Sequence, residues 1–212
     1  MCAIIGSFNQ QTLEELVEIN SYRGQHSYSI SEYDLENCTM NTRRKCLGSF
    51  SLQDIELRAG MYYVAHIQAP TTAASAIDSI HPSVRAEGRD LLWHNGIIKE
   101  ECVKDLQVGM SSSQSWDTGL IHDWIREGNQ LDAIDGTYSC LRYVAPSTYS
   151  KGAVFLFRNE ISPMFVDGKL NISSTKFEGS HQTKPNTMYK VNFNSNELEE
   201  AGTFKTKNNP YY

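Results

Sequence analysis

The chain opens on a short apolar run that starts at its second residue, Cys2-Ala3-Ile4-Ile5-Gly6-Ser7-Phe8. A run of this length that is followed by polar residues fits a buried strand better than a helix. Two further apolar runs end in polar residues at His66 and His94, and strand-like pieces fill much of the segment 138–193. Strands towards both ends of the chain, with helical segments between them, predict an α+β fold built in layers.

Two segments carry apolar residues at helical spacing. In the first, Thr12 is placed to cap a helix that runs to about Tyr22, with Glu15 as its capping-box partner. The second runs from about residue 115 to residue 125, and Asp117 lies near its start, where the helix dipole favours a carboxylate. Taken alone, Asp117 is as well explained by a helix cap as by a functional role.

Composition limits the partners and the compartment. The chain has 212 residues, a net charge of -6 and no apolar window long enough to cross a bilayer, so we expect one domain over 1–212, with neither nucleic acid nor a membrane as partner. Five cysteines without a Cys-x-x-Cys pair, and no secretory signal, indicate free thiols in a reducing cytoplasm. Four of them are expected to be buried packing residues: Cys38, Cys46, Cys102 and Cys140.

The order of several short motifs is more specific than any one of them. Along the chain these are Met1-Cys2-Ala3-Ile4-Ile5-Gly6, Tyr22-Arg23-Gly24, Ala65-His66, Ala69-Pro70-Thr71, His81-Pro82, His94-Asn95-Gly96-Ile97-Ile98 and Asp117-Thr118. In this order and spacing they resemble the class II glutamine amidotransferases, and the resemblance runs from residue 1 to about residue 193. It implies the four-layer αββα sandwich of N-terminal-nucleophile hydrolases and the hydrolysis of L-glutamine to glutamate and ammonia.

The position of Cys2 has a chemical logic of its own. Removal of Met1, which the small side chain at position 2 should permit, would give Cys2 a free α-amine with an ordinary pKa near ~7.7–8.0. Such an amine can take the thiol proton directly or through a water molecule. The thiolate then attacks an amide carbonyl and forms a thioester, without a histidine partner.

The resemblance assigns roles to the remaining site residues. The side-chain amide of Asn95 and the backbone N–H of Gly96 are expected to form an oxyanion hole, and Asp117 to bind the α-amine of glutamine. Thr71 is expected to contact the substrate. At position 68 this chain has Gln68 where the family normally has the arginine that binds the α-carboxylate. A neutral amide cannot make the charged two-bond contact of a guanidinium, so weaker glutamine binding, or a substrate without that carboxylate, is expected.

Three alternatives stay open at this point. The ammonia is expected to go to a synthetase on a separate chain, but the protein could instead hydrolyse a different amide, or be a catalytically silent regulatory subunit. Retention of Cys2, Asn95, Gly96 and Asp117 argues against the silent subunit. No cofactor is expected. A metal site on His66, His81 and His94 is not expected either, because their spacing follows the amidotransferase pattern.

Overall fold

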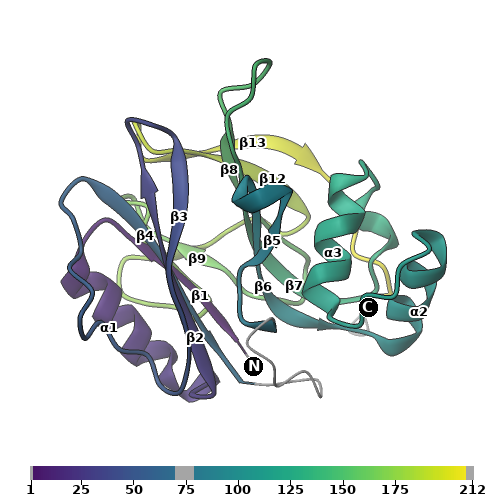
Figure 1. Cartoon of the computed structure of the whole chain (residues 1–212), viewed down its shortest axis with the longest axis horizontal. Helices are drawn as coiled ribbons and strands as arrows, with labels where there is room; N and C mark the ends of the chain where they lie inside the picture. The colour runs from purple at the N-terminus through teal and green to yellow at the C-terminus, as the bar shows by residue number, and fades with distance from the viewer. Residues whose placement is uncertain (1, 70–78, 209–212) are drawn as a thin grey trace.

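The computed structural model describes residues 2–69 and 79–208, and within them two antiparallel sheets are stacked face to face (Figure 1). The first sheet has the strand order β11 (His181–Gln182), β9 (Phe165–Val166), β10 (Ile172–Ser173), β1 (Ala3–Ser7), β4 (Met61–Gln68), β2 (Ser27–Asp34) and β3 (Thr39–Leu47). The second has the order β13 (Glu197–Thr203), β12 (Thr187–Asn192), β8 (Ala153–Arg158), β7 (Gly136–Val144), β6 (Asp90–Ile98) and β5 (Ser83–Arg85).

Helices cover the outer face of each sheet. On the first sheet lies α1 (Gln10–Asn20), which leads into the short 3-10 turn η1 (Ser21–Arg23). On the second lie α2 (Glu100–Gly109) and α3 (Asp117–Arg126), and the shorter turns η3 (Ala86–Gly88) and η4 (Leu131–Ala133) lie in the connections. The molecule is therefore a layered α+β structure, as the sequence predicts.

Side-chain alternation along the strands explains the layering. In β1, Ile4 points into the core between the two sheets, whereas its neighbours Ala3 and Ile5 point to the core beneath α1. In β6, Trp93 faces the core between the sheets and Leu92 faces the core beneath α2 and α3. Successive residues of a strand point to opposite faces, so strands that are apolar on both faces require a covering layer on each side.

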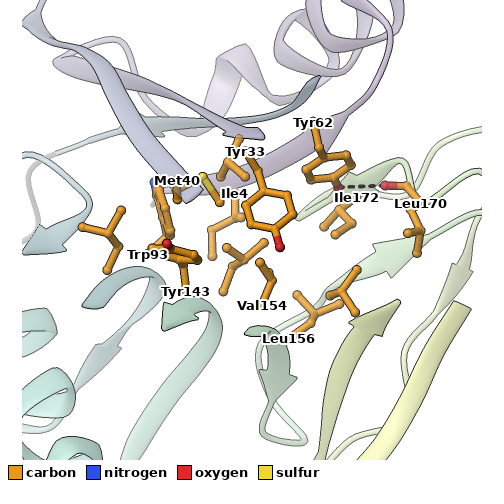
Figure 2. Close-up of a cluster of buried hydrophobic side chains, with 14 of the residues drawn as sticks. Ile4, Tyr33, Met40, Tyr62, Trp93, Tyr143, Val154, Leu156, Leu170 and Ile172 are labelled. Atoms are coloured by element: carbon orange, nitrogen blue, oxygen red, sulfur yellow. Dashed lines mark hydrogen bonds between the residues drawn. The ribbon is translucent and has the colours of Figure 1, made fainter. Parts of the chain in front are cut away.

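The core between the sheets is rich in aromatic side chains (Figure 2). Tyr62 from the first sheet and Trp93 from the second are fully buried there, with Leu156 from β8. The Tyr62 hydroxyl donates a 2.8 Å hydrogen bond to the backbone carbonyl of Leu170, which satisfies its polar end inside the apolar layer. This packing fixes the two sheets against each other. The first sheet contains β1, which begins directly after Cys2, and the second contains Asn95 in β6.

Two sequence expectations were wrong in detail. The cap of α1 is Asn9, whose side chain accepts the backbone N–H of Thr12, so Thr12 lies inside the helix rather than at its start. Cys46 is exposed and Cys38 is half-buried, whereas Cys102 and Cys140 are buried as expected. Cys46 is exposed because it lies in β3, the edge strand of its sheet.

Among the described residues, no helix combines the length and the apolar character needed to cross a membrane.

Candidate active site

Cys2 lies immediately before β1, a strand in the interior of the first sheet between β10 and β4. Its side chain is buried, and the thiol contacts the backbone carbonyl oxygen of Ala69 at 3.8 Å. Burial raises the pKa of the Cys2 thiol from 9.0 to about 11, because the thiolate loses its hydration. The thiol therefore stays protonated at neutral pH unless a base takes the proton.

A serine connects the start of β1 to Asn95 across the two sheets. The Ser174 hydroxyl accepts the backbone N–H of Ile4 at 3.0 Å and the side-chain amide of Asn95 at 3.2 Å. The same amide donates to the Ser139 hydroxyl at 3.5 Å, and the Asn95 backbone carbonyl accepts from Ser162 at 3.0 Å. These bonds hold the buried Asn95 from several sides and bring it next to the strand that begins after Cys2.

Gly96 follows Asn95 in β6, where the backbone is closely packed. A Cβ atom at this position would overlap the carbonyl oxygen of Thr137 on the neighbouring strand and lie 2.8 Å from Nε2 of His94. Real Cβ atoms do not make such contacts, so the local packing requires glycine here.

Asp117 is the first residue of α3 and is buried. Its Oδ1 accepts the backbone N–H of Thr118 at 2.7 Å, whereas Oδ2 is buried without a hydrogen-bond partner in the described part of the chain. Burial is the main cause of the raised pKa of Cys2, and the charge of Asp117 raises it further, which places the carboxylate within electrostatic reach of the thiol. A buried carboxylate oxygen without a partner is costly, so the site favours a ligand that donates to it.

Gln68 is buried at the end of β4, and its amide contacts two neighbours. One N–H of the amide donates to the backbone carbonyl of Ser79 at 3.3 Å, and the amide oxygen lies 3.1 Å from Nδ1 of His81. Thr71, the other expected substrate contact, lies outside the described residues. Arg23 donates to the Ser174 carbonyl and to the Thr175 hydroxyl, so this arginine holds the turn that follows β10.

Sequence reasoning missed the partners that hold these residues in place. Ser139 and Ser162 give no signal, because isolated serines in strands and loops are common. Strand register places Ser139 opposite Asn95, and the connection after β8 brings Ser162 to the Asn95 carbonyl. Thr118 follows Asp117 in the motif but has no evident role there. In the structure its hydroxyl lies between His81 and His94, at 3.0 and 3.1 Å.

Comparisons with known proteins bear on the fold. No family model and no curated protein sequence matches the chain. Among solved structures, it is similar to glutamine phosphoribosylpyrophosphate amidotransferase from B. subtilis in complex with ADP and GMP, with a TM-score of 0.67 at 15% sequence identity. The match covers 96% of this chain and 50% of that chain, so this chain spans about half the length of the structure it matches.

This similarity, together with the two stacked sheets and their outer helices, defines the fold class. The fold is a four-layer αββα sandwich of the N-terminal-nucleophile hydrolase type, like that of the amidotransferase structure it matches. It confirms the fold that the sequence resemblance implies.

The buried histidines beside the site make stability depend on pH. Burial lowers the pKa of His66 to about 3 and that of His81 well below its usual value, and the two rings stack at 3.9 Å. The unfolded chain binds a proton at each ring near pH ~6.5, whereas the folded chain does not. The contribution of the two neutral rings to the free energy of unfolding is thus fully present above pH ~6.5 and is lost as the pH falls.

We expect the free energy of unfolding to fall by about 1.4 kcal/mol per pH unit for each of these two rings below pH ~6. Urea unfolding between pH 7.5 and 5.0 measures this slope. The variant His66→Gln should reduce the slope by the contribution of one proton. A free energy of unfolding that stays constant over this range would contradict neutral, buried rings.

Proposed function

We propose that this protein hydrolyses the side-chain amide of L-glutamine to glutamate and ammonia, with Cys2 as the nucleophile. The observation that carries the proposal is the link through Ser174 between the strand after Cys2 and the Asn95 amide, together with the buried carboxylate oxygen of Asp117 that has no partner among the described residues. A buried thiol, an amide donor and a buried carboxylate together supply a nucleophile, an oxyanion donor and a site for an ammonium group.

The proposed base is the α-amine that Cys2 would have after removal of Met1. With a pKa of about 11, the thiol needs such a base at neutral pH. The amine takes the thiol proton, the thiolate attacks the amide carbon, and the amine returns a proton to the departing nitrogen as ammonia leaves. Water, activated by the same amine, then hydrolyses the thioester to glutamate and regenerates the thiol.

Attack places a negative charge on the amide oxygen. We propose that the Asn95 side-chain amide and the Gly96 backbone N–H donate to this oxygen, each contributing about 2.7–4 kcal/mol to transition-state stabilisation. Both N–H groups of the Asn95 amide have hydroxyl partners, Ser174 at 3.2 Å and Ser139 at 3.5 Å, so the N–H of the longer contact would turn from Ser139 to the amide oxygen of the substrate when the charge appears.

Binding of the substrate is proposed to rely on Asp117 and Gln68. Oδ2 of Asp117, which has no partner within the described ranges 2–69 and 79–208, would accept a charged hydrogen bond from the α-ammonium group. Gln68 uses one N–H for Ser79, which leaves the other for a neutral bond to the α-carboxylate. Thr71 would add a contact from the segment that follows β4.

The released ammonia is proposed to pass to a synthetase partner in trans. A second candidate function, hydrolysis of another amide by the same mechanism, is favoured by one observation. Gln68 is neutral and its amide already contacts Ser79 and His81, so a charged contact to an α-carboxylate is missing at this position.

Labelling with a glutamine-like electrophile, diazo-oxo-norleucine, tests the proposal. We expect mass spectrometry to show a chain without Met1, with one label on Cys2, and glutamine to protect against labelling. Cys140, which is also a buried thiol, is the internal control and should stay unlabelled. Labelling of Cys2 without glutamine hydrolysis would favour the second candidate, and an unreactive Cys2 would contradict both.

A further inference from the structure

Thr118 is the meeting point of a buried hydrogen-bond chain that includes Gln68 and whose other members have no part in the proposed chemistry. Its hydroxyl lies 3.0 Å from Nε2 of His81 and 3.1 Å from Nδ1 of His94. His81 continues the chain through its Nδ1 to Gln68, and Gln68 ends it at the carbonyl of Ser79. This hydrogen-bond chain therefore runs from Gln68, at the end of β4, to His94, the residue that precedes Asn95.

The chemistry of the end groups sets the direction of the chain. The Ser79 carbonyl can only accept, so the NH2 group of Gln68 faces it and the amide oxygen of Gln68 faces His81. Nδ1 of His81 must then carry the proton. Burial lowers the pKa of His81 well below its usual value, so the ring is neutral and its Nε2 accepts.

The single proton of the Thr118 hydroxyl therefore goes to His81. The hydroxyl oxygen can then only accept from Nδ1 of His94, which must carry a proton. Burial also lowers the pKa of His94, so Nε2 of His94 has no proton and lies 3.4 Å from the carbonyl oxygen of Thr137.

The opposite direction fits the distances less well. It would put a proton on Nε2 of His94 and leave Nδ1 of His81 without one, so two acceptors, Nδ1 of His81 and the Gln68 oxygen, would face each other at 3.1 Å. In the first direction the two acceptors that face each other are Nε2 of His94 and the carbonyl oxygen of Thr137, which lie 3.4 Å apart. The two facing acceptors come closer in the opposite direction, 3.1 Å against 3.4 Å, so the first direction is favoured.

The ring that this chain orients lies against the proposed oxyanion hole. Nε2 of His94 lies 2.8 Å from where a Cβ of Gly96 would be, so the ring lies beside Gly96 and occupies the space that a side chain there would need. The backbone N–H of Thr118 also holds Oδ1 of Asp117 at 2.7 Å. The Thr118 hydroxyl also lies 3.4 Å from the same carboxylate oxygen. Thr118 thus contacts both sides of the site, and its backbone makes the closer contact with Asp117.

We propose that Thr118 is a positioning residue, whose hydroxyl fixes the His94 ring against Gly96 and so keeps the oxyanion hole in its reactive geometry. This inference rests on the proposed function. It separates two effects, because loss of the hydroxyl removes the 3.4 Å contact to Asp117 but leaves the 2.7 Å backbone hydrogen bond to the same carboxylate in place. The rate of the chemical step should therefore depend on the hydroxyl, while binding of the substrate amine should not.

Steady-state hydrolysis of glutamine by Thr118→Val and Thr118→Ser tests the proposal. We expect Thr118→Val, which keeps the shape but not the hydroxyl, to lower kcat by about 10- to 100-fold and to change KM by less than about threefold. Thr118→Ser should recover most of the lost kcat. The matched control is Thr187→Val, which removes a buried hydroxyl from β12 and should leave kcat unchanged.

Wild-type kcat in a folded Thr118→Val variant, or an equal loss in both Thr118 variants, would overturn the proposal. A second measurement needs no variant and no activity: 15N NMR of the wild-type histidines should show both His81 and His94 protonated at Nδ1. Protons on Nε2 of these rings would overturn the assigned direction. If the wild type does not hydrolyse glutamine, the proposed function fails, and the NMR result still decides the hydrogen-bond chain.

Discussion

Replacing Cys2 with alanine should lower ammonia release from glutamine by about four orders of magnitude or more, because the substitution removes the only atom proposed to form the thioester. The side chain is buried and small, and within the described part of the chain its one hydrogen-bond contact is the 3.8 Å approach to Ala69. The folded structure should therefore survive the change. Glutamate and ammonia production, measured with purified variant and wild type, checks the expectation.

Cys140→Ala is the matched control for this experiment, because Cys140 is a fully buried thiol whose own pKa burial raises well above its usual value. It should retain activity, although the core beneath α2 and α3 loses a sulfur atom. Unfolding transitions of both variants exclude loss of the fold as the cause. Glutamine turnover by Cys2→Ala at more than a small fraction of the wild-type rate would refute the assignment of the nucleophile.

A chain in which Cys2 is preceded by a cleavable tag should be nearly inactive and should become active on cleavage. The tag converts the α-amine of Cys2 into an amide, which cannot take the thiol proton. With a pKa of about 11, the thiol is ionised in roughly one molecule in 3,000 at pH 7.5 without help from a base. We therefore expect a loss of about 1,000-fold in kcat before cleavage.

The tagged and cleaved samples are the same protein, so each preparation contains its own control. Cleavage that leaves Cys2 as the first residue should restore activity, whereas cleavage that leaves one extra residue should not. Equal activity of the tagged and cleaved proteins would show that another group activates the thiol.

Several structural elements could be predicted from the sequence because their signals are local. The apolar run after Cys2 forms β1, and the helix that begins at Asp117 follows from apolar spacing and a carboxylate at its first turn. Two other elements, β3 and α2, have no such signal. The strand β3 is a polar edge strand, and α2 buries only Cys102 and Leu106, so neither has enough apolar periodicity to stand out.

The sequence by itself determined which chemical groups the protein has, and in which order: Cys2, Gln68, the Asn95-Gly96 pair and Asp117. Only the tertiary structure decided what surrounds each of them. Ser174 lies next to both Ile4 and Asn95 because two strands far apart in sequence come together at the site. Hydrogen bonds between such distant residues depend on sheet register and helix packing, which no local pattern encodes.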